Sequence, residues 1–205
     1  MLISTIAKLP ISRYLRFSMS LNLSQPESGK ILIAEPLLGD PNFDRSIVLL
    51  AEHNDDGTVG FVLNRPVDVA FDELVIGFPE FEAQIFEGGP VQVDNLFFLH
   101  RKGDLLPGSE KIMDGVFWGG DLEVLKEMIA LEMIGPEDIR FFLGYSGWSS
   151  GQLQEELDQN SWLVAESNDA LVFNHESDSL WSLIMRQLGG EYALWHNAPL
   201  DPSLN

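Results

Sequence analysis

Residues 141–166 read FFLGYSGWSSGQLQEELDQNSWLVAE, and local signals mark every junction between secondary-structure elements in this stretch. The apolar run 141–143 predicts a strand, and Gly144 and Gly147 predict a tight corner at its end. The later run 162–165 has little polar interruption, which is typical of a strand covered on both faces. A helix is expected between them, so the stretch predicts a strand–turn–helix–strand unit.

The expected helix begins after Ser149, which stands three residues before Gln152 in the spacing of a capping box. Leu153 and Leu157 lie four residues apart and form a narrow apolar stripe toward the core. The other side chains are expected to face water: Gln154, Glu155, Glu156 and Asp158.

The corner between Gly144 and Trp148 has three interpretations. A nucleophile elbow would place Ser146 on a strand-to-helix turn, but Trp148 stands where G-x-S-x-G requires its last glycine. Free amides at the helix start could bind an anion. In the structural interpretation, which we favour, glycines turn the backbone while Tyr145 and Trp148 pack against the core.

Length and composition predict one globular domain. The chain has 205 residues, of which 45% are hydrophobic, so a sizeable core can form. No apolar run approaches the ~18 residues of a membrane span. The absence of cysteine excludes disulfides and thiol catalysis and fits the cytoplasm, where we expect the protein.

The net charge of −20 is unevenly distributed. Residues 1–19 carry three of the 12 Lys and Arg and no acid, which leaves 9 basic against 32 acidic groups, or −23, in residues 20–205. Arg101 and Lys102 are the only adjacent basic pair. Direct nucleic-acid binding is therefore disfavoured, because an acidic body repels phosphates.

Two apolar runs, 47–52 and 59–63, flank the dipeptide Asp56-Gly57 and predict a β-hairpin. Its tip also carries residue types that bind hard metals: Glu52, His53, Asp55 and Asp56. The Gly and Glu positions of a Ca²⁺ loop are missing, so we expect a polar turn and no metal site.

The remaining pattern mixes hairpins in the first half with helices in the second. It predicts one α+β domain with a mixed, strongly curved sheet. Further strands are expected at 31–35, 96–100 and 170–173, and the clearest helices at 121–134 and from 177 or 178 to 188.

Two loops join the corner in the expected functional surface. Gly88-Gly89-Pro90 fixes a sharp bend and permits close backbone approach, more often by a strand than by a ligand. Arg65 is expected to have a carboxylate partner in so acidic a body, and the functional alternative is a guanidinium that faces an anion at a loop. We expect these loops to converge, and the candidate ligand or interaction residues are Arg65, Gly88, Gly89, Pro90, Tyr145, Ser146, Gly147, Trp148 and Gly151.

Four signatures in this order resemble the YqgE/AlgH family of bacterial proteins. They are ILIAEPLLGDPNFDRS (31–46), GFVLNRP (60–66), GGPV (88–91) with LFFLH (96–100), and GYSGW (144–148) leading to Leu163-Val164. The resemblance covers roughly residues 20–197. It implies a compact α+β domain, with a sheet folded into a pseudo-barrel and helices outside, in a cytosolic bacterial protein. It brings no activity and no catalytic residues.

The resemblance also suggests the chain's boundaries. Residues 1–19 fall outside it and are interpreted as an extension from a start assigned upstream of Met19, or as a poorly ordered extension. Residues 20–197 form the expected domain, and 198–205 are expected to be a loose tail.

Three functions remain open. We favour a non-enzymatic regulatory or accessory protein, monomeric or homodimeric, that binds a protein partner or a small ligand and needs no cofactor. A hydrolase would use Ser146 with His100 as base, although a lone histidine at a strand end is more often structural. Some relatives are labelled transcriptional regulators, but the charge disfavours that role here.

Overall fold

The computed structural model describes residues 25–36, 38–174, 179–190 and 192–195. Its strands are β1 (Ile31–Ala34), β2 (Ile47–Asn54), β3 (Gly57–Val62), β4 (Ile85–Glu87), β5 (Val91–His100), β6 (Glu110–Met113), β7 (Val116–Trp118), β8 (Ile139–Ser149) and β9 (Trp162–Ala165). Its helices are α1 (Phe71–Leu74), α2 (Leu122–Ala130), the short 3₁₀ helix η2 (Pro136–Asp138), α3 (Gln152–Asp158), α4 (Asp169–Val172), α5 (Leu180–Leu188) and α6 (Tyr192–Trp195). The predicted extension 1–19 and tail 198–205 lie outside the described residues.

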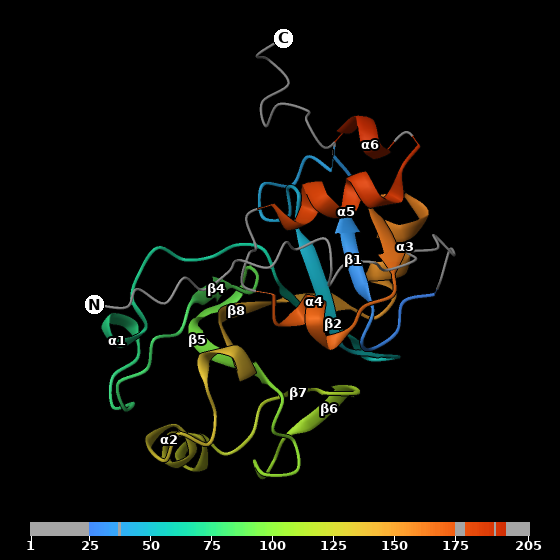
Figure 1. The fold of residues 1–205 in the computed structure, drawn as a ribbon. Coiled ribbons are helices and arrows are strands. Elements are labelled where there is room, and N and C mark those ends of the chain that lie inside the picture. The colour runs from blue at the N-terminus through green and yellow to red at the C-terminus, as the bar shows by residue number, and fades with distance from the viewer. Residues whose placement is uncertain (1–24, 37, 175–178, 191, 196–205) are drawn as a thin grey trace, which may run out of the picture.

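The strands form one nine-stranded sheet in the order β6-β7-β5-β8-β3-β2-β1-β9, with β4 paired to β8 beside this path. Only β4 and β8 run parallel, so the sheet is mixed, as predicted. Figure 1 shows its two parts, β1–β3 and β5–β7, in different orientations and joined through β8. The α+β class is confirmed. The sheet stays open, whereas the resemblance implied a pseudo-barrel.

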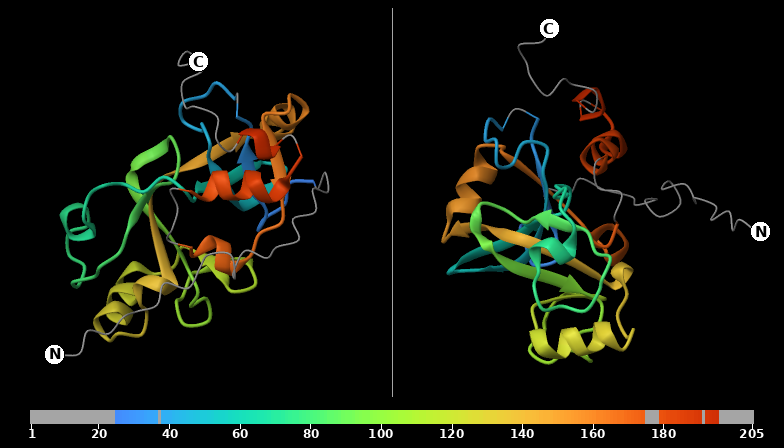
Figure 2. Two further views of the ribbon diagram at one scale, coloured as in Figure 1. Left: turned by 45° about the horizontal axis from the view of Figure 1, so that its top comes forward. Right: turned by 90° about the vertical axis from the view of Figure 1, so that its left-hand side faces the viewer.

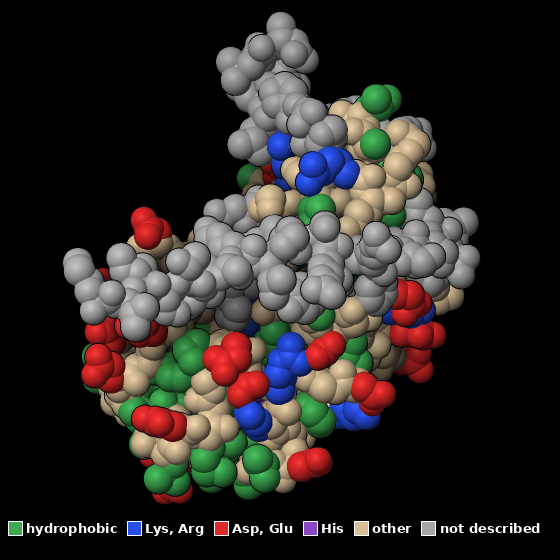
Figure 3. Space-filling model, viewed as in Figure 1, with side chains coloured by type: hydrophobic (Ala, Val, Ile, Leu, Met, Phe, Trp, Pro, Cys, Tyr) green, Lys and Arg blue, Asp and Glu red, His purple; other side chains and the backbone are tan. Residues whose placement is uncertain are grey.

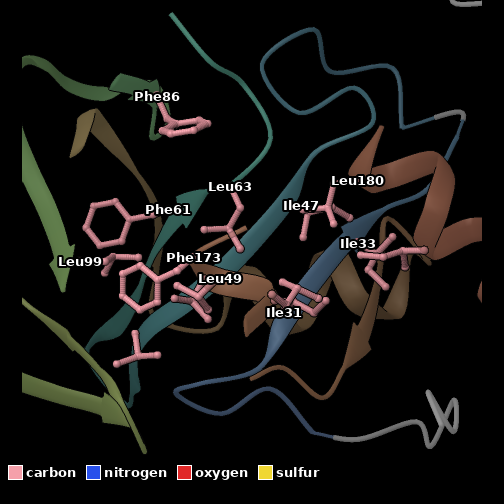
Figure 4. Close-up of a cluster of buried hydrophobic side chains, with 14 of the residues drawn as sticks. Ile31, Ile33, Ile47, Leu49, Phe61, Leu63, Phe86, Leu99, Phe173 and Leu180 are labelled. Atoms are coloured by element: carbon pink, nitrogen blue, oxygen red, sulfur yellow. The ribbon is translucent and has the colours of Figure 1, made fainter. Parts of the chain in front are cut away.

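Alternate residues of β1 and β2 enter different cores, because successive strand side chains point to opposite faces. One face gives Ile31, Ile33, Ile47 and Leu49 to the cluster in Figure 4, which α4 and α5 cover. The other face gives residues such as Leu32 to a cluster that contains Leu153 of α3 and Trp162 of β9. Figure 2 shows α3 and α5 on opposite sides of the strands, and the burial predicted for the run 162–165 is confirmed.

A third core lies under α1 and α2. Phe71 of α1 and Leu125 of α2 are buried with Phe98 of β5 and Phe141 of β8. The ring centroids of Phe71 and Phe141 are 4.6 Å apart. This core fixes both helices to the β5–β8 part of the sheet.

Arg140 of β8 is fully buried, which its sequence context did not predict. Its Nη1 donates to the carbonyl of Val172 and its Nη2 to that of Leu63, both at 2.6 Å. The guanidinium also lies 3.8 Å from the ring centroid of Phe86. Burial lowers the pKa of Arg140 to about 9, so the side chain is charged at neutral pH and ties α4 to two parts of the sheet.

Side-chain caps decide where two helices lie. Asp121 Oδ1 accepts from the amides of Glu123 and Val124 at 2.9 and 3.2 Å, which confirms the predicted start of α2. The strand predicted at 170–173 is wrong. Asn168 accepts from the amide of Leu171 at 2.8 Å and starts the short helix α4 in its place.

The predicted capping box is half formed. Gln152 Oε1 accepts from the backbone amide of Ser149 at 3.0 Å, as expected. The Ser149 hydroxyl, however, donates to the same oxygen at 3.2 Å, and Gly151 occupies the N-cap position of α3 with a φ of 77°. Gln152 thus fixes the backbone of Ser149 just before α3, and the Ser149 side chain caps no helix amide.

Candidate functional site

β8 is the element that positions the site, and it corrects the predicted corner. The strand continues through Gly144 to Ser149, so no turn separates it from the preceding apolar run. Gly144 bends the strand with a φ of 69°, and a Cβ there would lie 2.6 Å from the carbonyl oxygen of Gly89. The corner prediction failed because β3 pairs with residues 146–149, and this non-local pairing outweighs local glycine preference.

The loop Gly88–Gly89 packs directly on β8. The amide of Gly88 donates to the carbonyl of Leu143 at 2.8 Å, and its own carbonyl accepts from Ser146 Oγ at 3.0 Å. A Cβ on Gly89 would lie 2.4 Å from the carbonyl carbon of Tyr145. The space that these glycines leave is filled by strand backbone, as the sequence interpretation favoured.

Arg65 stands at the edge of the same region. Its carbonyl accepts from the amide of Glu87 at 2.8 Å, and its Nη1 lies 4.0 Å from Glu87 Oε1. Its Nη2 donates to the carbonyls of Pro41 and Asp44 at 3.2 and 3.1 Å. The carboxylate partner predicted for Arg65 is present at long range, but most of its hydrogen bonding anchors the loop before β2.

The Gly88–Gly89 loop therefore packs on β8, and Arg65 meets that loop through Glu87. Pro90 is exposed and follows Gly89, whereas Gly151 lies beyond the end of β8. A separate hollow of about 420 Å³ borders Gly151, between the β2–β3 tip and the start of α3.

A groove of about 430 Å³ opens where β3, β8 and the start of β5 meet. Its lining residues are Glu52, Asn54, Asp56, Gly57, Thr58, Val59, Val91, Tyr145, Gly147 and Trp148. Three predicted residues, Tyr145, Gly147 and Trp148, contribute to it. Six do not: Arg65, Gly88, Gly89, Pro90, Ser146 and Gly151.

Tyr145 is the half-buried aromatic residue of this groove. Its ring packs edge-on against Phe97, with centroids 5.5 Å apart and planes at 75°. Val91 pairs with Tyr145 in the β5–β8 ladder. The ring is thus held by the core on one side and contributes to the groove on the other.

A hydrogen bond to α3 holds Trp148 in place at the groove. It is buried, and its Nε1 donates to Glu156 Oε2 at 2.9 Å. The indole of Trp162 donates to the same oxygen at 2.8 Å. Glu156 was expected to face water, and its pairing with two indoles went unforeseen because the stripe Leu153–Leu157 does not predict partners.

The β2–β3 tip forms the acidic side of the groove. The predicted hairpin is confirmed, since Asn54 pairs with Gly57 and Asn54 Oδ1 accepts from the amide of Asp56 at 2.8 Å. Glu52 and Asp56 contribute carboxylates to the groove lining. Across the described parts of the chain, no group of three or more His, Cys, Asp and Glu residues is placed to hold a metal ion.

Ser146 and His100 do not form a catalytic pair. His100 pairs with Ile139 and Ser146 with Gly60, so the two lie seven positions apart along β8 (139 to 146), roughly 20 Å at strand spacing. Ser146 is buried and its hydroxyl donates to Gly88.

His100 has its own partners and is buried. Its Nδ1 accepts from the amide of Lys102 at 3.1 Å, so the proton of the neutral ring lies on Nε2. Nε2 lies 3.0 Å from the carbonyl of Gly119 and 3.1 Å from Ser109 Oγ. Desolvation lowers the pKa of His100, and the Gly119 bond opposes this more weakly. His100 is therefore a neutral structural residue, as favoured from the sequence, and this geometry does not support the alternative in which it serves Ser146 as base.

Comparisons with known proteins identify the family. A profile described as AlgH-like matches residues 31–193. A UPF0301 protein of Chlorobium luteolum is 46% identical over 87% of this chain and 94% of its own length, and one of Cytophaga hutchinsonii is 45% identical over 86% and 98%. The solution structure of AlgH from Pseudomonas aeruginosa has a TM-score of 0.67 and 31% identity, covering 87% of this chain and 98% of that one.

A protein of Corynebacterium diphtheriae shares the fold, with a TM-score of 0.73 at 22% identity over 86% of this chain and 95% of that one. Where the chain is described, no helix combines the length and apolar character needed to cross a membrane.

Proposed function

Because this chain belongs to the AlgH-like family, whose name states no reaction, we propose its function from the site. It is a non-enzymatic accessory or regulatory protein that binds a partner at the Tyr145 groove. The partner is a protein segment or a small ligand. We place this role in the bacterial cytoplasm, which is compatible with a chain that has no cysteine and so needs no disulfide.

The observation that carries the proposal is the position of Tyr145. A tyrosine ring offers both an apolar face and a hydroxyl, and such residues are common at binding surfaces. Here Phe97 fixes the ring, so binding requires little ordering of that side chain. Glu52 and Asp56 line the same groove and favour a ligand with a positive charge or hydrogen-bond donors.

The positions of Ser146 and His100 also favour binding over catalysis. The hydroxyl of Ser146 is engaged with a backbone carbonyl, and the neutral His100 lies far along the sheet with its own partners. A hydrolase needs a nucleophile and base within reach of each other.

Native mass spectrometry of the chain purified from a bacterial host tests the proposal. We expect an added mass or a co-purified protein that leaves on denaturation, that is lost in Tyr145→Ala and that is kept in Val93→Ala. Val93 is a matched control because it is an exposed β5 residue outside the groove lining. Equal retention by both variants would overturn the proposed site.

A further inference from the structure

A second surface, separate from the Tyr145 groove, displays apolar side chains around α1 and α2. Figure 3 shows hydrophobic side chains gathered over the α2 end of the molecule, with acidic side chains and a few basic ones at their margin. We define the α1–α2 surface by its exposed apolar residues: Val69, Leu74, Ile76, Leu122, Leu131 and Met133.

These side chains are displayed on a firmly packed base. Phe78 and Phe81, which follow α1, lie 6.2 and 6.3 Å from the ring of Phe141. Lys126 Nζ of α2 lies 5.4 Å from the Phe78 ring, which joins α2 to the loop after α1. Figures 1 and 2 both show that loop beside α2.

Two of these side chains are highly exposed even though residues close to them in the chain are buried. Ile76 is 93% exposed and Leu131 is 69% exposed, although neighbours of both enter the core. Single exposed apolar residues need no explanation, but a gathered group such as that over α2 in Figure 3 marks an interaction surface.

The charged residues around this surface indicate which kind of partner can bind it. Residues 66–84, which hold α1 and the loop after it, contain no Lys or Arg and five acids: Asp68, Asp72, Glu73, Glu80 and Glu82. On and beside α2 the exposed acids are Asp121, Glu123, Glu127 and Glu132. The one cation of α2, Lys126, is already paired with Glu123 at 2.7 Å.

We propose that the α1–α2 surface binds a cationic amphipathic helix of another protein, with apolar anchors on the exposed residues and Lys or Arg flanks on the carboxylates. Helices of this kind place apolar side chains at i, i+3, i+4 and i+7. Opposite charge steers such a partner and suppresses others. A second copy of this chain, at −20, and nucleic acid both carry the wrong charge.

Fluorescence anisotropy with a labelled peptide tests this surface. The probe is a synthetic Leu/Lys peptide in which leucine follows the helical period, and its control has the same composition with strictly alternating Leu and Lys. At physiological salt we expect the helical peptide to bind the intact chain at least tenfold more tightly than the control, since anchor spacing carries specificity.

Two variants separate apolar contact from charge attraction. Ile76→Asp and Leu131→Asp each add a negative charge, which would strengthen purely electrostatic binding. We expect each to weaken helical-peptide binding about tenfold, as for loss of an anchor. Leu194→Asp is the matched control, because Leu194 is 79% exposed on α6, away from this surface. Circular dichroism checks that all three fold.

Equal binding of both peptides, or unchanged binding in Ile76→Asp and Leu131→Asp, would overturn the proposal. Tyr145→Ala should leave peptide binding unchanged, since Tyr145 belongs to the separate groove. Failure at the α1–α2 surface therefore leaves the proposed function of that groove standing.

Discussion

The indole of Trp148 donates to Glu156 Oε2 at 2.9 Å, across the junction between β8 and α3. The same oxygen also accepts from Trp162, so one carboxylate joins a groove residue, a helix and the edge strand β9. This arrangement fixes Trp148 at the groove.

Removing the Glu156 carboxylate is expected to destabilise the fold. Glu156→Ala leaves two indole N–H groups without their acceptor and should lower the free energy of unfolding by about 2 kcal/mol. Glu156→Gln keeps an acceptor oxygen and should lose about 1 kcal/mol. Urea denaturation monitored by tryptophan fluorescence measures both, and equal losses in the two variants would contradict the shared-acceptor role.

The bend in β8 is expected to depend on Gly144. Gly144→Ala combines a positive φ with a Cβ 2.6 Å from a backbone oxygen and should lower unfolding free energy by about 3 kcal/mol. Gly77→Ala is the control, because its φ is 84° but its Cβ would meet no atom within 4 Å, and it should cost only about 1 kcal/mol. Similar losses in urea denaturation would show that close packing on Gly89 is unimportant.

Acid is expected to destabilise the protein partly through His100. Burial lowers its folded pKa below the ordinary 6.5, so the unfolded chain takes up this proton first as pH falls. Stability from this group is complete above pH 6.5 and declines below it, by up to about 1.4 kcal/mol per pH unit. His100→Gln should show a shallower decline between pH 6.5 and 5 than the unmodified chain; parallel curves would refute the assignment.

Ser146 is expected to matter for packing and not for binding. Ser146→Ala removes one hydrogen bond, while the Gly88 carbonyl still accepts from the amide of Val62 at 3.0 Å. We expect a loss of about 1 kcal/mol in unfolding free energy and no loss of the species bound at the groove in native mass spectra. Loss of that species with stability unchanged would give Ser146 a direct role.

Local patterns predicted the elements whose signals lie within a few residues. Asp56-Gly57 gave the hairpin turn, Asp121 the start of α2, and Gln152 the hydrogen bond that precedes α3. Each of these three features depends on residues close together in the chain, so a short stretch of sequence is enough to predict it.

The groove could be predicted only in part, because it depends on pairing between distant segments. The sequence singled out Tyr145 and Trp148 because these aromatic residues stand beside glycines. The same glycines suggested a turn, whereas pairing with β3 continues β8 as a strand through this region. Val91 and the carboxylate of Glu52 reach the groove through the β5–β8 and β2–β3 ladders. No local sequence pattern predicts the register of these two strand pairs.

Site-directed photocrosslinking in cells tests whether the Tyr145 groove binds a partner. A benzophenone amino acid replaces Glu52, which lines the groove, or Leu194, which is exposed on α6. We expect an adduct of defined mass from position 52, abolished by Tyr145→Ala, and none of that mass from position 194. The same adduct from both positions, or one from position 52 that survives Tyr145→Ala, would contradict it.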